Sequence, residues 1–187
     1  MSGKNLPPGK ADITHPAAEI IAADIERNVM PLPKIHIVLD RLRSAHNVGN
    51  IFRLADAVGA VEIVCCGYTA APPHPKLEKT AMGTDKTVPC RWFPDGVSAL
   101  RQLKSEGCLC VAVDTVEGAE DAWDFQIPEQ DIALVFGNEA LGISEEALGA
   151  CERFIQLPMF GGKSSINVGN CAAVVLYLLV RNGSEEK

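Results

Sequence analysis

The chain has 187 residues, of which 47% are hydrophobic and 5% aromatic, and its formal net charge at pH 7 is −7. This length is typical of one domain, which buries enough apolar surface to fold without disulfide or metal cross-links. The acidic balance argues against a general nucleic-acid-binding protein, which normally carries a basic surface, but it is compatible with a local basic cluster.

The first 33 residues are expected to form an extension to the main domain. Residues 1–16 are rich in Pro, Gly and Lys, which predicts a flexible segment without the apolar core of a signal peptide. Residues 16–30 show the helical spacing of isoleucines and end before a proline, which predicts a short helix. We therefore expect an extension over residues 1–33 and a main domain over residues 34–187.

Beyond the extension, apolar segments with strand and helix character alternate along the chain. Strands are expected at 34–40, 61–66, 86–93, 108–114, 131–137 and 153–158. Helices are expected at 47–60, within 73–83, and at 95–107, 144–151 and 164–181. Several of the strands are near-continuous apolar runs, so the pattern predicts an α/β fold with a mostly parallel sheet and helices on both faces. A proline in the third expected strand favours a place at the sheet edge.

The seven cysteines show no spacing typical of a metal site, because the sequence contains no CxxC pair and no histidine at ligand spacing. Most of them lie in apolar runs, where cysteine behaves as a small hydrophobic residue. We expect no bound metal, and free thiols in a cytoplasmic protein. The most apolar helical stretch, residues 172–180, is too short to span a bilayer.

The segment FGNEALGIS, residues 136–144, places small and polar residues directly after an expected strand. The carboxyl ends of the strands are where parallel α/β sheets bind ligands. Gly137 lets a ligand approach the backbone closely, and Glu139 is placed to hydrogen-bond a neighbouring loop or an RNA group. By itself the segment is also typical of a strand-to-helix turn without any ligand.

A second glycine-containing loop, residues 157–167, follows the last expected strand. Ser164 or Ser165 is a candidate cap for the final helix, and Asn167 is expected in its first turn, where free N–H groups point outward. The letters GGKSS look like part of a phosphate-binding loop. The pattern GxxxxGK[ST] requires glycine where this chain has Leu157, which argues against an NTPase.

The segment SAHNVGNIFRLADAVGA, residues 44–60, combines a possible helix cap, Asn47, with an arginine six residues later. The guanidinium of Arg53 has a planar fork that suits phosphate, although a solvated surface arginine is the simpler interpretation. The candidate nucleic-acid-binding residues around this segment are Arg41, Arg43, His46 and Arg53. A further basic group is equally compatible with an ordinary surface; its members are Lys76, Lys79, Lys86 and Arg91.

The final helix is apolar around most of its circumference, which predicts burial on nearly all sides. A second subunit or the same domain can supply the covering surface. The residues concerned are Val168, Cys171, Ala172, Ala173, Val174, Val175, Leu176, Leu178 and Leu179.

Taken together, the three segments over about residues 34–181 resemble the SpoU/TrmH family of RNA 2′-O-ribose methyltransferases. The resemblance implies an α/β fold with a deep C-terminal trefoil knot, a homodimer, and transfer of a methyl group from S-adenosylmethionine to tRNA or rRNA without a metal. The implied cofactor-binding residues are Gly137, Leu157, Ile166, Asp114 and Thr115. The implied catalytic residues are Arg53, Asn47, Glu139, Ser165 and Asn167.

One position departs from the family pattern, because Ser44 stands where the family often has a second asparagine, three residues before Asn47. Two other classes of function stay open at this point. One is a non-catalytic RNA- or cofactor-binding protein on the same fold. The other is an unrelated doubly wound nucleotide-binding enzyme, although no GxGxxG follows a strand here.

Overall fold

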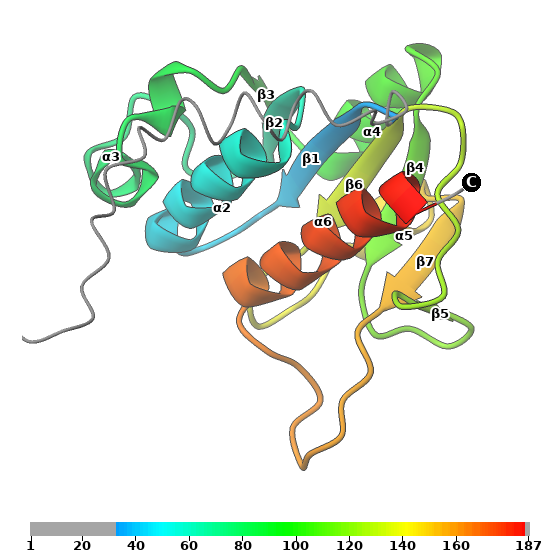
Figure 1. The fold of residues 1–187 in the computed structure, drawn as a ribbon. Helices are drawn as coiled ribbons and strands as arrows, with labels where there is room; N and C mark the ends of the chain where they lie inside the picture. The colour runs from blue at the N-terminus through cyan, green and yellow to red at the C-terminus, as the bar shows by residue number, and fades with distance from the viewer. Residues whose placement is uncertain (1–32, 186–187) are drawn as a thin grey trace, which may run out of the picture. The chain divides into compact units, whose positions relative to one another are not determined.

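The computed structural model describes residues 33–185, which form a parallel sheet of seven strands with helices on both faces (Figure 1). The strand order is β3-β2-β1-β6-β4-β7-β5. The strands are β1 (Ile35–Asp40), β2 (Glu62–Cys66), β3 (Cys90–Phe93), β4 (Leu109–Val113), β5 (Glu120–Asp121), β6 (Ile132–Phe136) and β7 (Arg153–Gln156). The helices are α2 (Ala45–Val58), α3 (Pro75–Ala81), η1 (Thr84–Lys86), α4 (Gly96–Ser105), α5 (Glu145–Leu148) and α6 (Val168–Glu185).

The predicted α/β class and the parallel pairing are confirmed, and all strands expected from apolar runs are present. The short strand β5 was not expected, because its two residues are acidic and become a strand only by pairing with β7. The expected extension over residues 1–33, with its helix, lies outside the described residues except for Pro33.

Two helix starts differ from the prediction. Helix α2 begins at Ala45 and its cap is Ser44, whose hydroxyl accepts a hydrogen bond from the Asn47 backbone N–H, so the Asn47 side chain is left free for another contact. The last helix begins at Val168 instead of residue 164, and its first free N–H groups are satisfied by the side chain of Asn167. Neither Ser164 nor Ser165 caps it.

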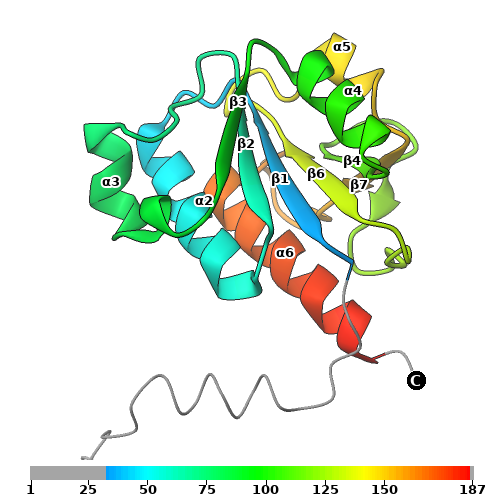
Figure 2. The same cartoon turned by 90° about the horizontal axis from the view of Figure 1, so that it is seen from above.

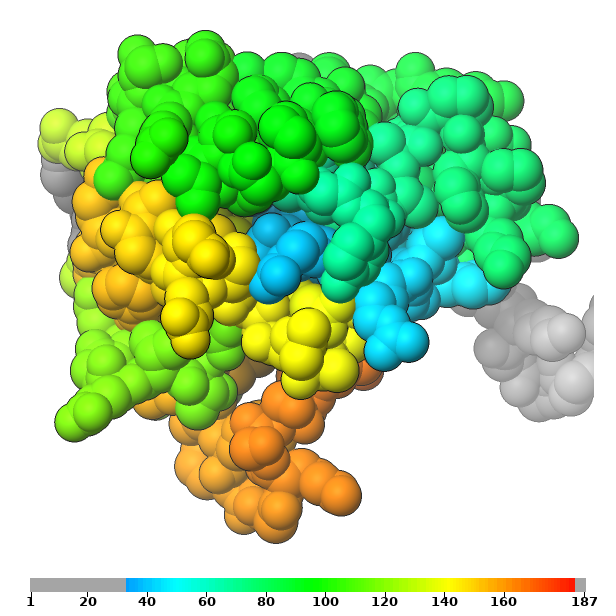
Figure 3. All heavy atoms as spheres, turned by 180° about the vertical axis from the view of Figure 1, so that it is seen from behind, coloured from blue at the N-terminus to red at the C-terminus, as the bar shows by residue number. Residues whose placement is uncertain are grey.

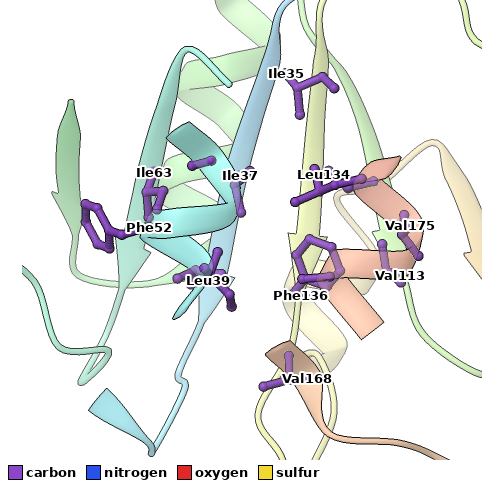
Figure 4. Packing of buried hydrophobic residues seen from close by; sticks show 14 of the residues in the cluster. Ile35, Ile37, Leu39, Phe52, Ile63, Val113, Leu134, Phe136, Val168 and Val175 are labelled. Atoms are coloured by element: carbon purple, nitrogen blue, oxygen red, sulfur yellow. The ribbon is translucent and has the colours of Figure 1, made fainter. Parts of the chain in front are cut away.

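The two faces of the sheet carry separate apolar layers. Helices α2, α3 and α6 lie on one face and helices α4 and α5 on the other (Figure 2). Alternation along β1 sends Ile37 and Leu39 into the first layer, with Phe52 and Val175, and sends Val38 into the second (Figure 4). Among the described helices, none combines the length and apolar character needed to cross a bilayer. All seven cysteines are free thiols.

Candidate active site

A cavity of about 570 Å³ opens where β4, β6 and β7 end, at the carboxyl edge of the sheet. Its lining includes the strand ends Val113, Phe136 and Gln156, and residues of the neighbouring loops form the rest of the lining. In Figure 3 the yellow segment around residues 138–149 and the orange loop around residues 157–166 border a hollow on this face of the molecule. The sequence-predicted cofactor residues in the lining are Asp114, Thr115, Gly137, Leu157 and Ile166.

The charged side chains that line the cavity are all acidic. Three carboxylates line it, those of Asp114, Glu139 and Glu145, and none of the lining residues is Lys, Arg or His. A triphosphate would bring several negative charges next to these carboxylates. A ligand with positive groups, by contrast, is attracted to them. The electrostatics therefore favour a cationic ligand that also has apolar parts, because Leu157, Ile166 and other apolar side chains share the lining.

Gly137 is required by the chain itself. A Cβ atom at this position would lie 2.2 Å from the backbone nitrogen of Ile143 and 2.6 Å from the carbonyl oxygen of Gly142. The loop after β6 folds back here, with two backbone hydrogen bonds of 2.9 Å between Asn138 and Gly142. The sequence analysis expected this glycine to admit a ligand. Its first role is to let the wall of the cavity close against the end of β6.

Asn138 is a site residue that the sequence analysis did not identify. Its side-chain oxygen accepts hydrogen bonds from the backbone N–H groups of Ala140 and Leu141, at 2.9 and 3.0 Å. Its amide nitrogen donates to the carbonyl oxygen of Arg41 at 2.8 Å and to the hydroxyl of Tyr68 at 2.9 Å. A buried asparagine with every bond satisfied fixes the loop in one conformation. In the sequence, the feature that could have identified Asn138 is its position directly after a glycine at the end of an expected strand.

Asp114 ties the end of β4 to the same loop. Its carboxylate accepts hydrogen bonds from the backbone N–H of Ile143 at 3.0 Å and from that of Thr115 at 2.8 Å. Its two oxygens still have lone pairs for a ligand, because each accepts only one of these bonds. The resemblance-based assignment of Asp114 and Thr115 to the cofactor site is therefore compatible with the geometry.

Asp40, a residue of the core, anchors the end of the loop that leads into α5. It is fully buried, and its carboxylate accepts hydrogen bonds from the backbone N–H of Ser144 at 2.9 Å and from the Ser144 hydroxyl at 2.8 Å. Ser144 directly precedes α5 but does not cap it with its side chain, because its hydroxyl donates to Asp40. The last residue of β1 thus fixes the segment that begins α5.

Glu139, Asn47 and Asn167 form one chain of hydrogen bonds that joins the loop after β6, the first turn of α2 and the residue before α6. The Asn47 amide donates to the Glu139 carboxylate at 3.0 Å, and the Asn167 amide donates to the side-chain oxygen of Asn47 at 3.2 Å. The backbone N–H groups of Arg43 and Ser44 also donate to Glu139, at 2.9 and 3.1 Å. The structure therefore brings together three of the five residues assigned to catalysis.

The environment of Glu139 determines its protonation state. Partial burial raises the pKa of its carboxyl group, but hydrogen bonds from the Arg43 backbone and from other donors, including the Asn47 amide, outweigh burial, so the net pKa lies below the usual value. Glu139 is therefore an ionised acceptor at neutral pH. Because its oxygens are already used by three donors, its geometry suits the positioning of loops better than the removal of a proton.

The remaining two residues assigned to catalysis lie differently. Ser165 is exposed, lines the cavity and forms no hydrogen bond with any other described residue. Arg53 is exposed on α2, does not line the cavity, and none of the described residues forms an ion pair or hydrogen bond with it. Six residues of helix separate it from Asn47, which amounts to about 9 Å along the axis and about 120° around it. The sequence analysis gave a solvated surface arginine as the simpler interpretation, and no partner for Arg53 is found within residues 33–185.

The four residues assigned to RNA binding fall into two classes. Arg43, His46 and Arg53 are exposed. Arg41 is half-buried, and its Nε atom lies 3.5 Å from the carboxylate of Asp40.

The further basic group divides in the same way. The side chains of Lys76, Lys79 and Lys86 are exposed. Arg91, in contrast, is held by the carboxylates of Glu62 and Glu106 and is not available to a ligand. Within residues 33–185 no three His, Cys, Asp or Glu side chains are grouped in a way that could hold a metal ion.

Comparison with known proteins adds independent information. Residues 34–177 match the model of a family described as the SpoU rRNA Methylase family. A tRNA (guanosine(18)-2′-O)-methyltransferase of Thermus thermophilus is 35% identical over 147 residues, which cover 78% of this chain and 73% of that protein. A 23S rRNA (uridine(2479)-2′-O)-methyltransferase of Streptomyces viridochromogenes is 32% identical, over 87% of this chain and 58% of that protein.

Solved structures show the same similarity. The SpoU methyltransferase AviRb from Streptomyces viridochromogenes, in complex with the cofactor AdoMet, matches with a TM-score of 0.73 and 28% identity. The match covers 81% of this chain and 61% of that one. An AdoMet-bound rRNA methyltransferase from Sinorhizobium meliloti matches with a TM-score of 0.74 and 26% identity, over 79% of this chain and 56% of that one. The chain thus spans less than two thirds of either solved relative.

Proposed function

The chain belongs to the SpoU rRNA Methylase family, and from this premise we propose that it transfers the methyl group of S-adenosylmethionine to a ribose 2′-hydroxyl of tRNA or rRNA. One observation supports this most directly. The acidic cavity at the sheet edge shares Glu139 with the hydrogen-bonded chain that includes Asn47 and Asn167. A cofactor site and a candidate substrate site therefore meet at one loop.

The lining of the cavity fits this cofactor. S-adenosylmethionine carries a sulfonium and an ammonium group, and the Asp114, Glu139 and Glu145 carboxylates give the cavity a negative potential. Gly137, Leu157 and Ile166 are among the lining residues, and their backbone groups are the candidates to recognise the adenine by its edge. When bound, the cofactor supplies an electrophilic methyl group on a positively charged sulfur.

The residues of this chain have three tasks in such a transfer: to hold the ribose in line, to keep the loops rigid, and to help move the hydroxyl proton. Ser165 has a free hydroxyl at the cavity and is placed to orient the ribose. Asn47 and Asn167 keep the loops before α2 and α6 in register through Glu139. Glu139 acts as a positioning residue, because its lone pairs face backbone donors.

Arg53 is assigned to the RNA side as a clamp on the phosphate next to the methylated ribose. A guanidinium has a pKa above about 12 and is a poor base, whereas it binds phosphate through two parallel hydrogen bonds. Since Arg53 lies away from the cavity of its own chain, this role requires that the site be completed at a subunit interface. We therefore propose a homodimer with the active site at or next to the contact.

The exposed side of α6 supports this assembly. Val174 is 37% exposed and Tyr177 is 54% exposed, and their three-residue spacing places them on one side of the helix. Figure 1 shows α6 beside α2, the helix that carries Arg53. In contrast, Val175 and Leu179 lie in the apolar core of the single chain, so only part of the apolar circumference is left for a partner.

We expect that Val174→Glu turns the dimer into a monomer without unfolding it, because a carboxylate is costly at an apolar contact but tolerable on an exposed helix face. Light scattering should give twice the 20.0 kDa chain mass for the wild type and one chain mass for the variant. Val61→Glu is the matched control, since Val61 is 38% exposed but lies outside α6, and it should stay dimeric. A wild-type monomer with full activity would contradict the shared site.

Val175→Glu or Leu179→Glu should instead unfold the chain, because both side chains lie in its core.

The proposed function is tested with the purified chain, tritiated S-adenosylmethionine, and bulk tRNA and rRNA taken from cells that lack the gene. Tritium incorporation, followed by mass-spectrometric mapping of ribose methylation, should identify one or a few nucleotides. Cofactor binding without methylation of either RNA would support the alternative, a non-catalytic binding protein on the same fold.

Three further expectations accompany the proposal and stay predictions. They are the trefoil knot around the cofactor loops, an extension over residues 1–33 preceding the methyltransferase domain, and a cytoplasmic location.

A further inference from the structure

Two exposed aromatic side chains stand at the carboxyl edge of the sheet without a role in the cofactor site. Tyr68 follows β2 and is 59% exposed, and Trp92 lies in the edge strand β3 and is 57% exposed. They meet at one turn, because the indole N–H of Trp92 donates a hydrogen bond of 3.0 Å to the carbonyl oxygen of Gly67, the residue before Tyr68. Neither ring is needed to close the apolar core.

Both rings are fixed by their polar atoms while much of their surface stays open. The hydroxyl of Tyr68 accepts a hydrogen bond of 2.9 Å from the amide of Asn138, and the only polar atom of the Trp92 side chain is used at Gly67. Such rings lose little further conformational freedom when a flat ligand stacks on them. This arrangement differs from a loose surface aromatic, whose mobility would oppose binding.

The position of the pair indicates what stacks there. Asn138, which holds Tyr68, also lines the proposed cofactor cavity, so Tyr68 is hydrogen-bonded to a residue of the cavity wall. In Figure 3 the blue segment around residue 40, the teal segment that follows β2 and the yellow loop around residue 140 lie side by side on one face. A ligand on the pair would therefore lie beside the loop that forms the cavity wall.

One arginine, Arg41, lies next to the pair, and its Nε atom also lies 3.5 Å from the carboxylate of Asp40. The same Asn138 amide bonds to the backbone of Arg41, and the Cγ atom of the Arg41 side chain would be 3.2 Å from a Cβ atom on Gly67. Arg43 follows two residues later with an exposed side chain. Exposed aromatic rings with an arginine beside them are the kinds of group that bind the bases and phosphates of single-stranded RNA. An apolar protein partner would need a larger continuous apolar patch than two rings.

We propose that Tyr68 and Trp92 form a base-stacking platform that binds an unpaired nucleotide flanking the methylated one. The inference rests on the proposed RNA 2′-O-methyltransferase activity and adds to it a substrate feature: the RNA is single-stranded or unstacked next to the target. Stacking accepts every base, so the platform contributes affinity and placement, and sequence selection comes from other contacts.

The first test is spectroscopic and does not depend on catalysis. The chain has two tryptophans, and Trp123, which follows β5 at the opposite edge of the sheet, is 45% exposed and outside the site. In the Trp123→Phe protein, bulk tRNA or rRNA should quench the fluorescence of Trp92. In the Trp92→Phe protein, the same RNA should leave the fluorescence of Trp123 unchanged. RNA binding, seen by a mobility shift, without quenching of Trp92 would overturn the platform.

The second test separates placement from chemistry. Tyr68→Leu and Trp92→Leu should each raise the KM for RNA about tenfold, the usual range for one stacked base, with little change in kcat. Tyr68→Phe keeps the ring but loses the hydrogen bond to Asn138, so its KM should lie between those of the wild type and Tyr68→Leu. Trp92→Leu should retain wild-type S-adenosylmethionine binding by calorimetry, because neither Trp92 nor its partner Gly67 lines the cavity, and Trp123→Leu serves as the matched control. Tyr68→Leu is compared with Tyr68→Phe, which loses the same hydrogen bond to Asn138, so the difference between these two variants reports on the ring alone.

The outcomes distinguish the platform from the activity on which it rests. If the wild type methylates RNA and the two leucine variants do so with unchanged KM, the platform is wrong and the activity stands. If the wild type binds the cofactor but methylates no RNA, the proposed activity fails and the platform falls with it. A change in oligomeric mass in the leucine variants would show that the pair is a protein contact and would also overturn the inference.

Discussion

Gly137→Ala is expected to weaken S-adenosylmethionine binding at least 100-fold, because the added methyl group has no space in the folded loop. Its Cβ atom would lie 2.2 Å from the Ile143 nitrogen and 2.3 Å from the Gly142 carbonyl carbon. These are backbone atoms of a turn held by hydrogen bonds at Asn138, so they have no rotamer change by which to move aside. The turn must shift, and with it the wall of the cavity.

The measurement is calorimetric titration of the folded variant with S-adenosylmethionine, with circular dichroism to verify the fold. Gly137→Val, which is larger, should be at least as damaging. Gly161→Ala is the matched control, since a Cβ atom at Gly161 would meet no atom within 4 Å. Binding by Gly137→Ala within a factor of three of wild type would show that the loop after β6 does not shape the cofactor site.

Arg53→Ala is expected to lower the rate of methyl transfer at least 100-fold while leaving the fold and the cofactor site unchanged. Arg53 makes no ion pair or hydrogen bond within the described part of the chain and lies outside the cavity, so its removal costs at most about 0.5 kcal/mol of stability. Its whole contribution should therefore appear in the reaction with RNA. Arg53→Lys should recover only part of the rate, because a point charge does not replace a bidentate fork.

Single-turnover rates with RNA, together with melting temperature and cofactor affinity, separate these effects. Arg101→Ala is the matched control: it removes an exposed arginine from α4, on the opposite face of the sheet, and should leave the rate unchanged. An Arg53→Ala enzyme of near wild-type rate would remove this residue from the mechanism. Asn167→Ala should also abolish transfer, but with some loss of stability, because Asn167 caps α6.

Local patterns were sufficient for much of the fold. Continuous apolar runs predicted six strands and their parallel pairing, since a strand buried on both faces has no polar side. The helix expected at 95–107 is present as α4 with Asp95 as its N-cap, because a cap depends on the few residues around it. Strand β5 was missed for the opposite reason: its two acidic residues have no strand signal apart from their partner β7.

The candidate site, like the fold, could be predicted from the sequence only in part. Motif resemblance assigned Gly137, Leu157 and Ile166 to the cofactor site, and the structure places these three residues in the lining of one cavity. The motifs did not identify Asn138 or Asp40, because the hydrogen-bond partners of these residues, Tyr68 and Ser144, lie far away in the sequence. A side chain whose hydrogen-bond partner lies far away in the sequence produces no residue pattern that sequence analysis can detect.

The sequence by itself determined which chemical groups stand at the strand ends, because glycines, carboxylates and amides follow the apolar runs directly. Only the tertiary structure decided which of those groups are joined by hydrogen bonds. It joined Asn47, Glu139 and Asn167 into one hydrogen-bonded chain and left Arg53 outside it. The physical reason is that hydrogen bonds between loops depend on distances set by the packing of the whole sheet, whereas the 3.6-residue turn of a helix sends two residues six apart in different directions.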